Sequence, residues 1–208
     1  MPTELARAVL LLTWLLVPEL PLRILPMQRT RKALLAALLI AATVALGYAL
    51  AGIPNVELMT ITVFISGYLL GAKLGAIVGA VSIAVYSVFN PMGSSVGVPL
   101  LLVAQVVAFA VIGVAGSILG GVVAKLPRVG AIIVAGVTGL VLTSLYDALT
   151  NIGAFYSITG EDAPTNLLKF IIGGIVFVVM HLVWNTALFA VALKPTLNVL
   201  ARYRRELA

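Results

Sequence analysis

Long apolar stretches alternate with short polar interruptions along most of the chain. A membrane-spanning helix needs about 20 apolar residues, with a usual range of about 17 to 25. Stretches of at least this length occupy Ala33–Ala51, Leu58–Phe89, Val98–Ala124, Val129–Asn151 and Asn166–Leu193. The first two are separated by the segment GIPNVELMT, which brings a proline, an asparagine and a glutamate into an otherwise apolar region. The pattern predicts an all-α integral membrane protein.

The second stretch decides how often the chain crosses the membrane. Leu58–Phe89 has 32 residues with Lys73 near its middle, and read as one helix it gives five spans. If it turns near Gly71–Leu74, it gives two short spans and six in total. Twelve of the 13 basic residues then lie on one side of the membrane, and only Lys169 lies on the other. The positive-inside rule makes the side with twelve the cytoplasm. Its basic residues are Arg7, Arg23, Arg29, Arg31, Lys32, Lys73, Lys125, Arg128, Lys194, Arg202, Arg204 and Arg205. We therefore predict a six-transmembrane-helix bundle with both termini in the cytoplasm.

The two ends of the chain differ from this bundle. The segment Ala6–Val17 is apolar but only 12 residues long, and Pro18, Pro21 and Pro26 follow it without a small-residue cleavage site. We predict that it is an additional amphipathic helix lying on the cytoplasmic membrane surface; a disordered leader is the alternative. The predicted organisation is an N-terminal interfacial segment (1–28), a six-span membrane domain (29–194) and a basic cytoplasmic tail (195–208).

Composition supports the membrane assignment and excludes several functions. Hydrophobic residues make up 62% of the 208 residues and charged residues 10%, whereas a soluble domain carries about a quarter charged residues. The chain has no cysteine, which excludes disulfides and thiolate metal sites. It has no G-x-x-x-x-G-K-[ST] motif, so any ATP that drives its function is hydrolysed by another chain. Its single histidine and the lack of an H-E-x-x-H motif argue against an intramembrane enzyme.

Small residues recur every four positions in the first four of the six predicted spans. In lipid, helices associate through close backbone approach, which small residues permit. The glycine and serine series are explained by packing within the bundle: Gly67, Gly71, Gly75 and Gly79, then Gly113, Ser117 and Gly121. The first span carries a continuous stripe, suited to docking on a separate protein or to ordinary packing: Ala33, Ala37, Ala41, Ala45 and Ala49.

Polar and aromatic side chains gather in the predicted outer halves of the spans. Such groups are costly in lipid and are usually paired or functional. They are Tyr86, Asn90, Gln105, Tyr146, Asp147, Asn151 and His181. Asn90 precedes Pro91 and also fits a turn, His181 also fits a bond to Asn185, and Asp147 also fits a pair with Lys169 or His181. Because the inner halves are mostly aliphatic, the asymmetry favours a binding pocket open to the outside.

The chain resembles the substrate-binding S components of energy-coupling factor (ECF) vitamin transporters over roughly residues 31–193. The resemblance rests on the alanine-rich first span, the connection IPNVELMT, the short spans meeting at LLGAKLGAIVGA, the NPMG end of the third span and LYDALTN closing the fifth. It implies a six-helix bundle in a prokaryotic cell membrane. It also implies that the chain is a transport subunit and not itself an enzyme, and that a membrane T component with two ATPase subunits is its partner.

The resemblance also implies roles for residues of this chain. Docking on the T component would use Ala33, Ala37, Ala41 and Ala45. The loop after the first span would cap the ligand through Asn55 and Glu57, above a pocket that the polar residues of the outer halves would form. We expect no permanently bound cofactor and no metal; the transported ligand would be a vitamin or cofactor precursor, polar and ring-bearing. Two other functions remain open: an ion-coupled secondary carrier using Asp147 and His181, and a structural membrane scaffold similar to the cell-shape protein MreD.

Overall fold

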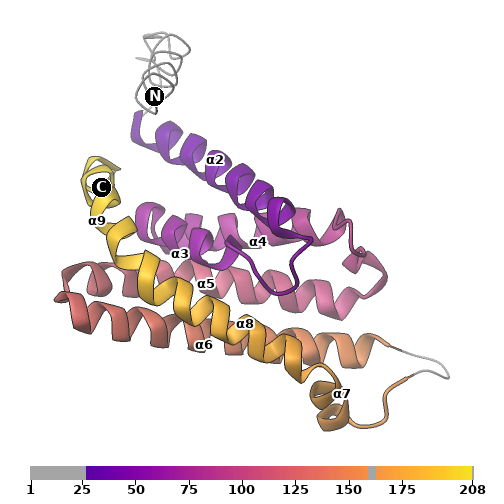
Figure 1. Ribbon diagram of the computed structural model, residues 1–208. Coiled ribbons are helices and arrows are strands. Elements are labelled where there is room, and N and C mark those ends of the chain that lie inside the picture. The colour runs from indigo at the N-terminus through magenta and orange to yellow at the C-terminus, as the bar shows by residue number, and fades with distance from the viewer. Residues whose placement is uncertain (1–26, 159–162, 208) are drawn as a thin grey trace, which may run out of the picture. The chain divides into compact units, whose positions relative to one another are not determined.

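The structure is a computed structural model that describes residues 27–158 and 163–207 (Figure 1). These residues form helices and connecting loops, with no β-strand among them. The chain divides into two units, residues 1–31 and 32–208. The described part of the first unit, residues 27–31, is the beginning of one helix; the rest of that helix and all later elements belong to the second unit. The predicted interfacial helix at Ala6–Val17 lies outside the described residues.

The helices follow the predicted apolar stretches, with differences at their ends. They are α2 (Met27–Leu50), α3 (Met59–Leu70), α4 (Ala72–Val88), the short 3₁₀ turn η1 (Ser95–Gly97), α5 (Pro99–Lys125), α6 (Arg128–Ser157), α7 (Leu167–Gly173), α8 (Ile175–Leu188), the π-helical segment η2 (Phe189–Leu193) and α9 (Lys194–Leu207). Pro99 begins α5 at a position where the missing N–H costs nothing, because the first helical N–H groups have no partner within the helix.

Within the described residues, four helical segments are long and apolar enough to cross a membrane: Arg29–Leu50, Pro99–Lys125, Arg128–Ser157 and Ile175–Arg205. This finding agrees with a multi-pass membrane protein. Helices α3 and α4 are apolar but have only 12 and 17 residues. At 1.5 Å per residue, α3 is about 18 Å long, well short of the roughly 30 Å hydrocarbon core. The count of six spans therefore stays a prediction.

The turn predicted near Gly71–Leu74 is confirmed. Gly71 separates α3 from α4 and has φ of 86°, a left-handed conformation that glycine adopts without steric cost. Its N–H donates to the Gly67 carbonyl and its carbonyl accepts from the Gly75 N–H, both at 2.9 Å, so it closes one helix and opens the next. Lys73 is exposed in the first turn of α4. The charged residue therefore lies at a helix end and not in the middle of a span.

Glycines bring α3, α4 and α5 into backbone contact. A Cβ added at Gly67 would clash with the Gly113 carbonyl oxygen, and one added at Gly116 would clash with the Phe64 carbonyl. A Cβ at Gly79 would clash with the Phe109 carbonyl. The contacts Phe64–Gly116 and Tyr68–Gly120 run in the same chain direction, so α3 and α5 are parallel. The contacts Gly75–Gly113 and Gly79–Phe109 run in opposite directions, so α4 and α5 are antiparallel. Helix α5 also packs against α6 (Figure 1).

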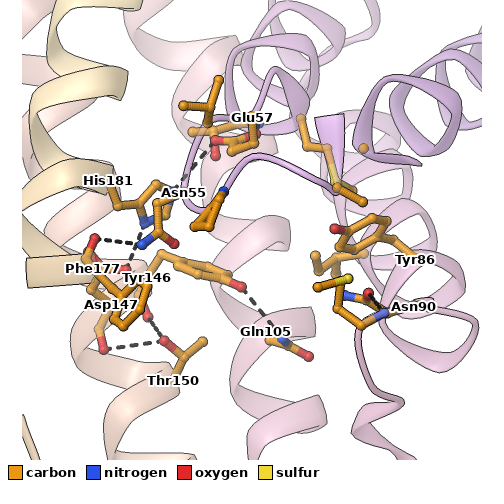
Figure 2. A pocket seen from close by; sticks show the side chains of 18 of the residues that line it. Asn55, Glu57, Tyr86, Asn90, Gln105, Tyr146, Asp147, Thr150, Phe177 and His181 are labelled. Atoms are coloured by element: carbon orange, nitrogen blue, oxygen red, sulfur yellow. Dashed lines mark hydrogen bonds and ion pairs between the residues drawn. The ribbon is translucent and has the colours of Figure 1, made fainter. Parts of the chain in front are cut away.

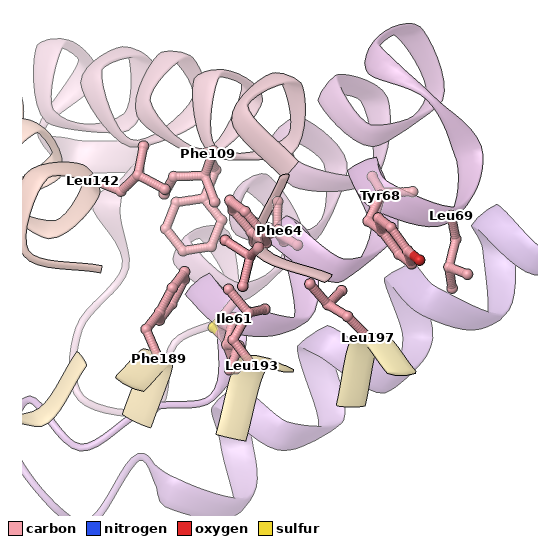
Figure 3. Packing of buried hydrophobic residues seen from close by; sticks show 14 of the residues in the cluster. Ile61, Phe64, Tyr68, Leu69, Phe109, Leu142, Phe189, Leu193 and Leu197 are labelled. Carbon is pink, nitrogen blue, oxygen red and sulfur yellow. The ribbon is translucent and has the colours of Figure 1, made fainter. Parts of the chain in front are cut away.

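A hydrophobic cluster fills the space between these helices and the last one (Figure 3). Phe64 of α3 is fully buried and makes an edge-to-face contact with Phe189, with ring centroids 5.4 Å apart. Leu193 and Leu197 follow Phe189 at intervals of four residues and are also fully buried. Leu197 belongs to the segment predicted to be a cytoplasmic tail. In the structure this segment continues the last helix and contributes to the core.

The last helix departs most from its predicted form. The predicted span Asn166–Leu193 breaks at Gly174 into α7 and α8, and beyond Leu193 it continues as α9. Pro195 has no N–H and its ring crowds the carbonyl four residues earlier, which explains why π-helical turns precede it at 189–193. The Lys194 ammonium donates to the Ala124 and Leu126 carbonyls, so it satisfies the end of α5.

Substitution of the contact glycines tests this packing. We expect Gly67→Ala and Gly113→Ala each to destabilise the protein by about 1–3 kcal/mol, because a methyl group must displace a backbone carbonyl. The measurement is thermal unfolding in detergent, followed by helical circular dichroism. Gly173→Ala is the control, since a Cβ there meets no described atom within 4 Å. Equal melting temperatures for all three variants would contradict the packing described.

Candidate functional site

A cavity of about 540 Å³ lies at the ends of α4, α5, α6 and α8, under the loop between α2 and α3 (Figure 2). This volume is in the range of small-molecule sites, roughly 300–1,000 Å³. All nine residues predicted to bind substrate line it: Asn55, Glu57, Tyr86, Asn90, Gln105, Tyr146, Asp147, Asn151 and His181. The structure thus brings together residues from four helices and from the two loops that contain Asn55 and Asn90. That they bind a ligand stays a prediction.

The loop between α2 and α3, residues 51–58, is held against α8. Asn55 has φ of 58°, a left-handed conformation that asparagine tolerates better than other non-glycine residues. Its amide group donates a 2.8 Å hydrogen bond to the Phe177 carbonyl oxygen. The indole N–H of Trp184 donates to the Glu57 carbonyl, also at 2.8 Å. These two hydrogen bonds join the loop to α8.

Glu57 connects the loop to α3 and to the cavity. One carboxylate oxygen, Oε2, accepts the Thr60 N–H at 2.8 Å and so satisfies a free donor in the first turn of α3. The other, Oε1, lies 3.7 Å from His181 Nε2. Burial raises the pKa of Glu57, but the neighbouring His181 imidazole and the Thr60 hydrogen bond outweigh it and hold the pKa below its usual value. Glu57 is therefore ionised at neutral pH.

Asp147 and His181 form the closest polar contact between α6 and α8. His181 Nδ1 lies 2.8 Å from Asp147 Oδ1, and the His181 side chain is buried. Of the partners considered for Asp147, the structure therefore selects His181 and not Lys169. The alternative bond between His181 and Asn185 is not formed; the Asn185 side chain is fully buried and has no hydrogen-bond partner among the described residues. Asp147, His181 and Glu57 make a continuous chain of ionisable groups (Figure 2).

Aromatic rings and amides complete the wall. Tyr146 packs edge-to-face against Phe109 and His181, with centroid distances of 5.5 and 5.7 Å. Gln105 Nε2 donates to the Tyr146 hydroxyl at 3.5 Å, a long hydrogen bond. Tyr86 lies on the opposite side of the cavity, from α4, and packs on Tyr48. The site thus combines charged groups on the α6–α8 side with aromatic groups on both sides.

Two of the predicted site residues also have a local structural role. The Asn90 side-chain oxygen accepts the Met92 N–H at 2.8 Å, and the Gly93 N–H donates to the Asn90 carbonyl. The turn interpretation of Asn90-Pro91 is therefore confirmed, although Asn90 lines the cavity as well. The Asn151 amide donates to the Asp147 backbone carbonyl in its own helix, at 2.7 Å. This amide is therefore already engaged within α6, although Asn151 also lines the cavity.

Sequence reasoning missed most of the less polar part of the lining. These residues include Gly47, Met59, Thr60, Met92, Phe109, Thr150, Gly174 and Phe177. In an apolar chain nothing distinguishes a cavity-lining phenylalanine from a lipid-facing one. The helix break at Gly173-Gly174, adjacent glycines within an apolar run, is the one available signal. No group of three or more His, Cys, Asp or Glu side chains placed to hold a metal ion occurs in residues 27–158 and 163–207.

Comparisons of the chain with models of protein families, with curated proteins and with solved structures find no match. What the fold and the site define is thus a class: a helical protein with several membrane-length apolar helices and a polar, aromatic-walled cavity beneath a tethered loop. The resemblance to ECF S components is therefore supported by the sequence motifs of this chain alone and stays a prediction.

Removal of one donor tests how the loop is held. We expect Trp184→Phe to speed amide hydrogen exchange in residues 52–58 about fivefold, because a hydrogen bond worth about 1 kcal/mol to the Glu57 carbonyl is lost. Hydrogen–deuterium exchange with mass spectrometry in detergent measures this. Tyr156→Phe, which alters an exposed aromatic residue of α6, is the control. Unchanged exchange in the loop of Trp184→Phe would show that other contacts hold it.

Proposed function

We propose that this chain is the substrate-binding subunit of an ATP-driven ECF-type importer. The observation that supports this best is the convergence of nine polar and aromatic residues, from separate parts of the sequence, on one cavity beneath a connecting loop. A scaffold has no need of such a cavity, since buried polar groups without a ligand or partner only destabilise a membrane bundle. The chain captures a vitamin or cofactor precursor from outside the cell.

The distribution of charge supports an outward-facing cavity. Lys73, Lys125 and Arg128 lie at the ends of α4, α5 and α6 remote from the cavity, and Lys194 contacts the same end of α5. By the positive-inside rule that end is cytoplasmic. The helix directions are compatible with six crossings, in which α3 and α4 form a short-helix hairpin pointing its Gly71 turn to the cytoplasm. Both termini are then cytoplasmic.

The alanine stripe of α2 is the proposed docking surface for the T component. Ala33, Ala37, Ala41, Ala45 and Ala49 are all exposed, whereas Ala36, Thr43 and Gly47 of the same helix are buried against the bundle. The stripe therefore lies on the free face of α2, and small side chains there allow another helix to approach closely. ATP hydrolysis belongs to the two ATPase subunits, and this chain is a transport subunit and not an enzyme.

Retention of ligand tests the proposed function. The protein purified from its membrane should carry a small molecule through detergent, and mass spectrometry of the denatured sample identifies it. We expect the Asn55→Gly variant to retain about tenfold less of this small molecule. The variant keeps the left-handed backbone but loses the amide that holds the loop to Phe177. Asn198→Ala, an exposed asparagine on α9, is the control. Purified protein that is empty and responds to no vitamin in thermal-shift assays would contradict the proposal.

A matched pair of alanine substitutions tests the docking surface. We expect Ala41→Leu to reduce co-purification of the T component and ATPases at least tenfold, because the longer side chain prevents close helix approach. Ala42→Leu is the control, since Ala42 is also exposed on α2 but lies off the stripe. Ligand retention should be the same in both variants. Equal loss of partners in both, or in neither, would place the contact elsewhere.

An ion-coupled carrier is the second candidate, and one observation favours it. Asp147, His181 and Glu57 form a chain of ionisable groups of the kind that relays protons in transporters. The two functions differ in what drives uptake. If vesicles that contain this chain alone take up the retained small molecule, and a protonophore abolishes this uptake, the chain is a carrier. If uptake of the molecule requires the T component and ATP, the chain belongs to the importer.

A further inference from the structure

The charges around the cavity are unbalanced. Its described lining contains two carboxylates, Glu57 and Asp147, and one imidazole, His181, but no lysine or arginine. The three side chains are largely buried, with exposed fractions of 19%, 13% and 9%. With both carboxylates counted as ionised and His181 as protonated, the formal charge of these three residues is one net negative charge. In a poorly solvated environment such a charge attracts a cation and repels an anion more strongly than in water.

The buried cavity-wall groups that lack a hydrogen-bond partner also favour a ligand that donates hydrogen bonds. Glu57 Oε1, Asp147 Oδ2 and Gln105 Oε1 are buried and have no hydrogen-bond partner among the described residues. All three are acceptors, and they belong to residues of the cavity wall. Buried acceptors without a donor are costly, most of all carboxylate oxygens. A ligand with N–H groups would satisfy them.

Several donors of the same site are already engaged within the protein. The Asn55 amide donates to the Phe177 carbonyl, and the Asn151 amide donates to the Asp147 carbonyl. Gln105 Nε2 donates to the Tyr146 hydroxyl, which leaves only its oxygen unpaired. The protein thus leaves acceptors unpaired in the cavity while it uses these donors on itself.

The aromatic part of the wall suits a flat, positively charged group. Tyr86, Phe109, Tyr146 and Phe177 all line the cavity. The face of an aromatic ring is electron-rich and attracts a cation placed over it. The same rings offer apolar contact to a planar ligand.

We infer that the cavity binds a planar ring carrying positive charge and N–H donors, such as an amidine or an amino-substituted nitrogen heterocycle, and discriminates against carboxylates and phosphates. This inference rests on the proposed function, in that the same cavity holds the imported molecule. Glu57 and Asp147 are the specificity-determining residues, and Gln105 supplies a further acceptor. The chemistry is read from the cavity wall and names no particular vitamin.

Three small probes of equal shape test the inference. Benzamidine, benzamide and benzoate share a ring and a planar substituent but carry positive, zero and negative charge. We expect benzamidine, at concentrations on the order of 10 mM, to raise the melting temperature of the purified full chain, and benzoate to leave it unchanged. Glu57→Gln and Asp147→Asn should each weaken benzamidine binding about 10- to 100-fold while keeping the shape of the site. Asn198→Ala should bind it normally.

A variant that adds a positive charge protects the test against variants that fail to fold. Gln105→Lys keeps both carboxylates and the pair with His181 but places an ammonium group in the cavity, so benzamidine should lose its advantage over benzoate. The inference is overturned if benzoate stabilises the unmodified protein as well as benzamidine does, if no probe has an effect, or if Glu57→Gln and Asp147→Asn fold and bind benzamidine normally.

The same experiments separate this inference from the proposed function. If the protein co-purifies with a T component and ATPases but retains an anionic molecule, the importer stands and the inferred ligand class fails. If benzamidine is preferred but no partner or retained molecule is ever found, the ligand class stands and the importer fails.

Discussion

Backbone contact between α5 and the α3–α4 hairpin is the constraint on which the rest of the structure depends. In lipid no hydrophobic effect drives helices together, so their association requires close packing. Gly67, Gly113, Gly116 and Gly79 remove the side chains that would keep these backbones apart. Helix α3 is too short to be a stable span by itself, and this contact fixes it in the bundle. Phe109, whose carbonyl abuts Gly79, is also a wall residue, so the same contact sets one side of the cavity.

The second constraint is electrostatic and acts at the opposite wall. Asp147 of α6, His181 of α8 and Glu57 of the loop come from three separate elements, and one oxygen of each carboxylate has no hydrogen-bond partner among the described residues. A buried ion pair is weak support for stability, because desolvation offsets most of the attraction. Hydrophobic residues at these positions would hold α6 and α8 together at least as well. The presence of the ionisable groups is therefore better explained by binding than by folding.

The sequence indicated the long apolar helices, the turn at Gly71 and the nine polar residues of the cavity wall, because each rests on a local rule: the length of an apolar run, glycine at a turn, and the cost of polar groups in lipid. It did not indicate how the elements meet. Nothing in the sequence pairs the indole N–H of Trp184 with the Glu57 carbonyl, because a contact across 127 positions leaves no local trace. Likewise Lys194-Pro195 suggested the end of the last span. The helix instead continues past the proline through a π-helical segment, held by core contacts of Leu193 and Leu197 that only the tertiary structure provides.

The free energies of these contacts decide which part of the molecule moves at the lower cost. On the proposed function, a ligand must pass the 51–58 loop to reach the cavity. The loop is tied to α8 by hydrogen bonds of Asn55 and Trp184, each with a net worth of about 0.5–1.5 kcal/mol. Phe177 O, the acceptor for Asn55, lies within α8 and can keep its helical bond when the loop leaves. Separating α5 from α3 and α4 would instead break an extended backbone contact together with its buried side chains. The difference in cost favours movement of the loop over separation of the bundle; on the proposed function, the helices would then hold the ligand-binding groups in place while the loop moves to admit the ligand.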